Sequence, residues 1–66
     1  MNENKFEFSL DLEHWEVISA VSAAHFLVGA WGDPVAVVSA PRPRPIVVSA
    51  RGPEAQPAWI RISPPA

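Results

Sequence analysis

The two histidines are the side chains best suited to metal binding or acid–base chemistry, and their spacing limits what they do. His14 and His25 are separated by eleven positions. On one helix they share a face but lie roughly 16 Å apart along the axis, so one metal ion does not reach both within a single chain. Asp11 places a carboxylate one helical turn before His14. A metal site needs three or four ligands, and we therefore predict no metal site.

Ser22 and His25 have the residue types of a nucleophile and its base. Acyl transfer also needs an orienting acid, an oxyanion hole and a serine presented on a strained turn, and the sequence supplies no pattern for them. His25 lies within an apolar run, where a neutral imidazole needs hydrogen-bond partners for its nitrogens. We predict a core or interface histidine beside Ser22, no catalytic residue, and a protein that is not an enzyme.

The segment from Ala24 to Trp31, with the sequence AHFLVGAW, resembles the pigment-binding stretch of purple-bacterial light-harvesting antenna polypeptides. In that family a histidine of a membrane helix ligates bacteriochlorophyll, and a tryptophan follows about two turns later. The resemblance covers eight of the 66 residues and implies a membrane helix with His25 as cofactor ligand. The chain departs from that family in its shorter apolar run, which ends at Gly32-Asp33-Pro34. We predict no cofactor, and keep the membrane-associated peptide as an alternative.

The histidines belong to a segment, residues 12–31, whose pattern predicts a helix. Asp11 suits the N-cap, Gly32 suits the position after the last helical residue, and Pro34 prevents continuation. One apolar stripe recurs at spacings of four, three, four and three residues: Val17, Val21, Ala24, Val28 and Trp31. The other faces carry small residues, so the helix is apolar all round and needs cover.

Period-two alternation before the helix predicts a strand over residues 5–10, with Phe6, Phe8 and Leu10 facing inward. After it, all eight prolines lie within residues 34–66. The sequence VVSA occurs at 37–40 and again at 47–50, which predicts a hairpin of strands near 35–40 and 45–50. A last strand is predicted at 58–62, with Ile60 and Ile62 inward and Trp59 and Arg61 outward. The alternative for residues 34–66 is a partly disordered tail.

The connection between the two VVSA segments, residues 41–45, alternates proline with Arg42 and Arg44. Such a segment favours the stiff polyproline II conformation. It is interpreted as a rigid connection between strands, or alternatively as a loop that presents the arginines for docking. Prolines at every second position do not match the Pro-x-x-Pro pattern of SH3-type ligands.

The length, composition and charge of the chain limit which classes of protein it can belong to. A chain of 66 residues forms one small domain, and without cysteine it has no disulfide to stabilise its core. Residues 1–33 carry six acids and one lysine, whereas residues 34–66 carry four arginines and one acid. Opposite halves attract within one fold or between two copies, and four arginines beside an acidic half make a poor nucleic-acid interface. The first residues lack the basic and apolar regions of a signal peptide, so a cytoplasmic protein is expected.

These observations predict an α+β fold: a single small domain, residues 1–66, with one apolar helix packed on a short antiparallel sheet and proline-rich connections. We predict a non-catalytic protein-interaction module or accessory subunit that self-associates through the helix, as a homodimer or with a larger protein partner. The membrane-associated peptide, and a chain with no selected function, remain as alternatives. The predicted interaction residues are Trp15, Ser22, His25, Gly29, Trp31, Arg42 and Arg44.

Overall fold

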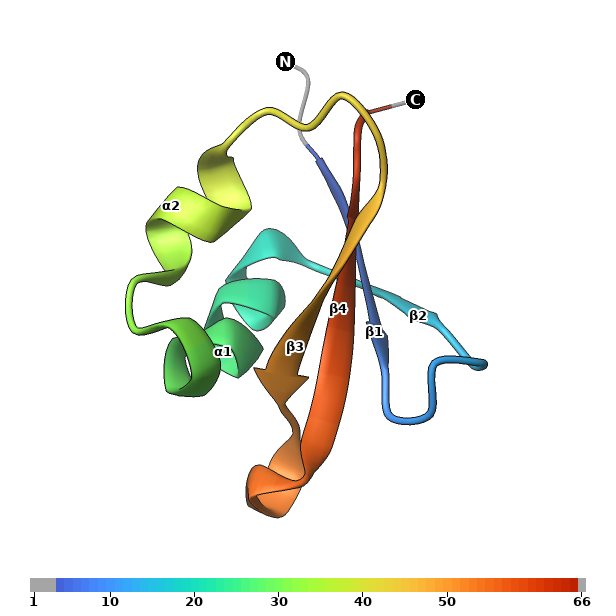
Figure 1. The fold of residues 1–66 in the computed structure, drawn as a ribbon, viewed down its shortest axis with the longest axis vertical. Coiled ribbons are helices and arrows are strands. Elements are labelled where there is room, and N and C mark those ends of the chain that lie inside the picture. The colour runs from blue at the N-terminus through green and yellow to red at the C-terminus, as the bar shows by residue number, and fades with distance from the viewer. Residues whose placement is uncertain (1–3, 66) are drawn as a thin grey trace.

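The fold is a four-stranded antiparallel sheet covered on one face by two helices, and it confirms the α+β prediction (Figure 1). The computed structural model describes residues 4–65, and the side chains of all of these except residues 30, 31 and 34–36. The elements follow in the order β1 (Lys5–Ser9), β2 (Glu16–Ile18), α1 (Ala20–Trp31), α2 (Pro34–Ser39), β3 (Ile46–Arg51), the 3-10 helix η1 (Pro53–Ala55) and β4 (Pro57–Ser63).

The strands lie in the order β2-β1-β4-β3, so the first and last strands of the chain form the centre of the sheet. Phe8 of β1 faces Ile60 of β4, and Ile60 in turn faces Val48 of β3. Side chains alternate between the two faces of a strand, and the even-numbered positions of β1 and β4 point toward the helices. The predicted strands 5–10 and 58–62 are therefore confirmed within a residue or two, with Phe6, Phe8, Ile60 and Ile62 inward as expected. The prediction that Leu10 faces inward is wrong, because Leu10 follows the end of β1 and is 47% exposed.

The core forms where α1 packs over the central strands. Leu27 and Ala23 of α1 are fully buried. The other buried apolar residues belong to the sheet: Phe6, Phe8, Ala50, Ala58, Ile60 and Ile62. Phe26 adds a stacked ring contact with Phe8, with ring centroids 4.5 Å apart.

The predicted helix 12–31 is correct in its end but wrong in its beginning. Ser19 is the N-cap, because its hydroxyl accepts a hydrogen bond from the backbone N–H of Ser22. The chain before it turns back as strand β2, which pairs with β1 through Phe6 opposite Ile18. Gly32 follows the helix with a φ of 76° and donates its N–H to the Val28 carbonyl, as the glycine at that position predicts.

The predicted strand 35–40 is wrong, because this segment forms the short helix α2. Pro34 stands at the first helical position, where the missing N–H is not needed. The carboxyl end of α2 is held by side chains distant in sequence: the Asn4 amide donates to the carbonyls of Val38 and Ala40. β3 consequently pairs with β4 rather than with residues 35–40, and the predicted hairpin is also wrong.

The described residues form no helix that is long and apolar enough to cross a membrane. α1 has 12 residues, against the roughly 20 that a spanning helix needs.

The sheet was expected to cover the apolar stripe of the helix, but two residues of that stripe, Val21 and Val28, are exposed. Val21 is 80% exposed, whereas Leu27 is fully buried. We therefore expect Leu27→Ala to lower the free energy of unfolding by about 2–5 kcal/mol, and Val21→Ala to change it by less than about 0.5 kcal/mol. Urea denaturation followed by circular dichroism checks both values. Equal losses for the two variants would contradict the observed orientation of α1.

Candidate functional site

The helix residues predicted to mediate contacts lie on different surfaces. His25 is exposed and makes an edge-to-face contact with Phe26, with ring centroids 5.5 Å apart. Ser22 is half-buried and receives a hydrogen bond from the Ser19 hydroxyl at 3.2 Å. The expected pairing of Ser22 with His25 is thus replaced by the cap of α1.

Gly29 lies on the exposed side of α1, but the aliphatic stem of Arg51 from β3 covers it. A Cβ atom at Gly29 would stand 3.2 Å from Arg51 Cγ. Gly29 therefore accommodates the side chain of Arg51 from the neighbouring strand. The side chain of Trp31, another predicted interaction residue, lies outside the described residues.

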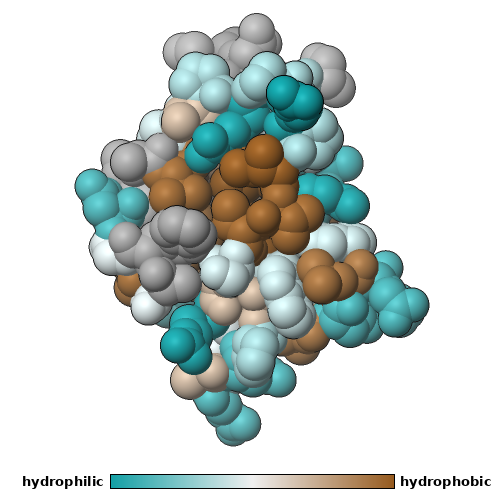
Figure 2. Space-filling model, viewed as in Figure 1, coloured by the Kyte–Doolittle hydropathy of each residue, from teal (hydrophilic) through white to brown (hydrophobic). Residues whose placement is uncertain are grey.

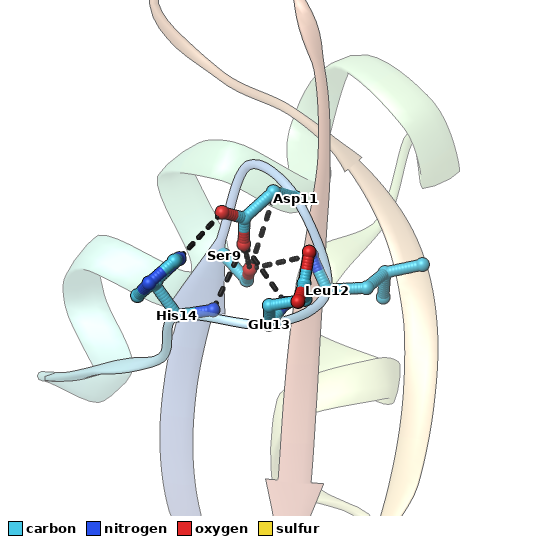
Figure 3. Close-up of polar contacts among 5 residues, drawn as sticks. All are labelled: Ser9, Asp11, Leu12, Glu13 and His14. Atoms are coloured by element: carbon cyan, nitrogen blue, oxygen red, sulfur yellow. Dashed lines mark hydrogen bonds and ion pairs between the residues drawn. The ribbon is translucent and has the colours of Figure 1, made fainter.

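The loop between β1 and β2, residues 10–15, contains the most concentrated polar cluster (Figure 3). Asp11 Oδ1 accepts hydrogen bonds from the backbone N–H groups of Glu13 and His14, each at 2.8 Å. Asp11 Oδ2 meets His14 Nδ1 at 2.6 Å. The Ser9 hydroxyl donates to Asp11 Oδ1 at 3.0 Å and accepts from the backbone N–H of Leu12 at 2.8 Å.

Asp11 therefore caps a turn in this loop, whereas the prediction that it is the N-cap of the helix is wrong because Ser19 holds that position. Leu12 adopts a φ of 67°, in the left-handed region where one residue reverses the chain and does not propagate a right-handed helix. Figure 3 shows the Leu12 side chain pointing away from the polar cluster. The chain is thereby directed into β2.

The same contacts decide the electrostatics of the loop. Hydrogen bonds from the His14 backbone and side chain, and from the Glu13 backbone, hold the pKa of Asp11 well below its usual range. The hydrogen bond with Asp11 and its negative charge raise the pKa of His14. Ser9 is fully buried and directs its hydroxyl to the carboxylate rather than to the imidazole. Serine, aspartate and histidine are thus brought together without the order of contacts that activates a serine nucleophile.

The sheet face opposite the helices carries a second charged pair. Arg61 of β4 donates through Nε and Nη2 to the two carboxylate oxygens of Glu7 on β1, at 2.9 and 3.0 Å. These hydrogen bonds lower the pKa of Glu7 and raise that of Arg61. Trp15 covers the pair, with the Arg61 guanidinium carbon 4.4 Å from its ring centroid. Trp15, a predicted interaction residue, is thus half-buried against the sheet.

Sequence reasoning predicted Arg61 to face outward but did not identify its pairing. The signal was partial: Glu7 and Arg61 both occupy outward positions of alternating strands. Their juxtaposition follows from the register, in which Glu7 lies directly opposite Arg61. The same row continues to Val17 of β2 on one side and to Val47 of β3 on the other. Val17 and Val47 are exposed, at 69% and 49%, and mark the two edges of the sheet.

The two arginines of the segment 41–45 have different environments. Arg42 is half-buried and donates from Nη2 to the carbonyl of Val37 in α2, at 2.8 Å. Arg44 is exposed. The segment connects α2 to β3 rather than two strands, so the predicted rigid strand connection is corrected in this respect.

The two helices leave some apolar residues at the border of the core, here called the core margin, only partly covered. Figure 2 shows hydrophobic side chains gathered near the middle of this view, beside β3 and the helices. Four valine and isoleucine residues of α2 and β3 pack against the core but are only partly buried: Val37, Val38, Ile46 and Val48. Within residues 4–65, no three histidine or acidic side chains lie close enough to hold a metal ion.

The Asp11–His14 pair predicts a measurable titration. Asp11→Asn keeps the oxygen that accepts the backbone N–H groups but removes the negative charge, and we expect it to lower the pKa of His14. Because the folded pKa of His14 is raised, the pair stabilises the fold below about pH 6.5, and this contribution is lost as the pH rises through the folded value. Histidine NMR titration measures the change. Glu13→Gln is the control, and an equal decrease there would contradict the assignment to Asp11.

Compared with protein-family models, with curated proteins and with solved structures, the chain matches none. The arguments for its function therefore come from the geometry described above.

Proposed function

We propose that the protein is a non-catalytic interaction module that self-associates through the outer edge of β3. The observation that carries the proposal is the position of this strand. β3 is six residues long, lies at the edge of the sheet, and pairs only with β4 among the described strands. Its other edge faces no further described strand, and an edge strand of this kind can accept an additional strand.

Within residues 46–51, β3 lacks several of the features that usually protect an edge strand. Natural edges are blocked by proline, by lysine, by a bulge, or by a covering element. Residues 46–51 contain neither proline nor lysine, and their pairing with β4 runs without interruption from Ile46 to Arg51. Val47 is 49% exposed on one face. On the other face, Ile46 and Val48 belong to the partly buried core margin.

A second copy of the chain is the occupant that this edge fits best. Two copies related by a two-fold axis at Ser49 would pair antiparallel and keep all even-numbered residues on the helix-covered side. Val48 of one copy would then lie opposite Ala50 of the other. The apolar margin beside each β3 would be covered by the same margin of its partner, as in an isologous interface.

Charge complementarity supports this arrangement. Arg44 precedes β3 and Glu54 follows it, and both are exposed. They lie at opposite ends of β3, a six-residue strand that spans about 20 Å, so they do not meet within one chain. In the antiparallel pair centred on Ser49, Arg44 of each copy faces Glu54 of the other.

Two other routes to self-association would use different surfaces of the protein. The helix route, expected from the sequence, would use the exposed side of α1 around Val21. A head-to-tail route would join β3 of one copy to β2 of the next and would form an open chain. β2 has three residues against the six of β3, so the head-to-tail pairing is shorter than the pairing of two β3 strands.

Three exposed valines distinguish the routes, because each lies on a different surface: Val47 on β3, Val17 on β2 and Val21 on α1. We expect a dimer of the native chain, and a dissociation constant at least 10-fold higher for Val47→Lys, which places a lysine opposite Arg51 of the partner. Val17→Lys and Val21→Lys should leave the constant unchanged. Light scattering and sedimentation over a concentration series measure it.

The outcomes separate the routes. Dissociation by Val21→Lys alone would contradict the edge proposal in favour of the helix. Dissociation by each of the single variants Val17→Lys and Val47→Lys would favour the head-to-tail chain. A native protein that stays monomeric at all concentrations would overturn self-association altogether.

A charge exchange tests the register itself. Arg44→Glu and Glu54→Arg should each weaken the dimer, because each places like charges together at both ends of the interface. The double variant should restore the native dissociation constant within about 3-fold, since the pair is only inverted. The control combines Arg44→Glu with Glu13→Arg, which alters an acid near the opposite edge of the sheet. Its dimer should stay as weak as that of Arg44→Glu alone. Absence of rescue in the first double variant would refute this register.

A further inference from the structure

A cavity of about 420 Å³ lies where the carboxyl end of α2 meets β1 and the start of α1. Its volume falls within the range of small-molecule sites, roughly 300–1,000 Å³. The walls are largely apolar and include Phe6, Ala20, Val38, Pro41 and Pro65. The cavity is independent of the β3 edge, so its function does not rest on self-association.

Arg42 is the only charged side chain among the described residues that line this cavity. One of its N–H groups donates to the Val37 carbonyl. Its Nε atom is buried and has no hydrogen-bond partner among the described residues. A buried donor without an acceptor is costly, and within residues 4–65 no carboxylate lies within ion-pair distance of this guanidinium.

Arg61 shows by contrast what a satisfied guanidinium does in this fold. Its Nε and Nη2 atoms hold both oxygens of Glu7, the two-pronged geometry that arginine favours with a carboxylate. Arg42 has the same donor groups at the margin of an apolar cavity but lacks the carboxylate.

The rim of the cavity is fixed by hydrogen bonds before any ligand binds. The Asn4 amide donates to the carbonyls of Val38 and Ala40, at 3.3 and 3.0 Å. These contacts join the first residues of β1 to the end of α2 across more than 30 residues of sequence. A rim held in this way reduces the ordering that binding would otherwise require.

We propose that the cavity binds a small carboxylate with an apolar body, such as an aromatic or branched aliphatic acid. The carboxylate pairs with the Arg42 guanidinium, which gives Nε–H an acceptor after a modest side-chain adjustment. The apolar body lies against Phe6 and Val38. A neutral ligand leaves the guanidinium unpaired, and a phosphate dianion finds only one cation among the described lining residues.

Benzoate, benzamide and acetate are the probes, because together they separate charge from apolar surface. In NMR titrations of the native protein, benzoate should shift the signals of Phe6, Val38 and the Arg42 Nε–H group. Benzamide, which keeps the ring but lacks the charge, should bind at least 10-fold more weakly. Acetate, which keeps the charge but lacks the ring, should also bind at least 10-fold more weakly.

Variants then assign the contact. Arg42→Met should weaken benzoate binding at least 10-fold, and Arg42→Lys, which keeps the charge but loses the planar fork, at least 3-fold. Arg44→Met, two residues away and outside the cavity lining, is the matched control and should bind benzoate as the native chain does. Circular dichroism verifies that each variant is folded.

The proposal is overturned if benzoate and benzamide bind equally, because the arginine then plays no part. It is also overturned if acetate binds as well as benzoate, which would indicate ion pairing at the surface without use of the cavity. These two comparisons use the native chain alone, so they decide the question even if Arg42→Met fails to fold.

Discussion

The packing of one short helix onto two central strands is the contact on which the rest of the structure depends. Leu27 and Ala23 of α1 are fully buried against the sheet, together with Ile60 and Ile62. A chain of 66 residues supplies only one covering layer, so the opposite sheet face and the β3 edge stay uncovered by described elements. The candidate surfaces arise from this limit rather than from any catalytic arrangement.

The strands β1 and β4 could be predicted from the sequence because period-two alternation is a local signal. Alternation at Phe6 and Phe8, and again at Ile60 and Ile62, states which side of each strand is apolar, and the structure agrees. The direction of α1 could not be predicted in the same way. Its residues are apolar or small on nearly every side, so the pattern has no clear phase. The valine stripe was chosen as the inward face, whereas Ala23 and Leu27 occupy it.

Two local signals were ambiguous for physical reasons. Asp11 accepts the N–H groups two and three residues ahead, as a helix N-cap does, but the positive φ of Leu12 turns the chain away from a helix. Residues 35–40 are rich in valine, which favours strands, yet they follow a proline suited to a helix start. Long-range hydrogen bonds from Asn4 then hold the end of α2, and no local pattern reports such contacts.

The sequence predicted the contacts of the candidate site least well where the register of paired strands brings side chains together. Trp15 was predicted as an interaction residue, and in the structure its ring lies against Arg61 of the Glu7–Arg61 pair. That pair joins the acidic and basic halves within one chain, as the uneven charge suggested. Arg42 was predicted in a rigid connection between strands, with a docking loop as the alternative, and its position at a cavity follows only from the packing of α2.

The remaining arginines explain why the two proposals concern the same half of the molecule. Asp11, Glu13 and Glu16 lie on the β1–β2 side of the sheet, whereas Arg42 and Arg44 immediately precede β3, at the other edge. The order β2-β1-β4-β3 separates these groups by the width of the sheet, whereas Arg61, on a central strand, pairs with Glu7 of the first half. Arg42 and Arg44 have no anionic partner among the described residues. The two proposals would supply negative groups at this edge: a carboxylate ligand at Arg42, and Glu54 of a second copy at Arg44.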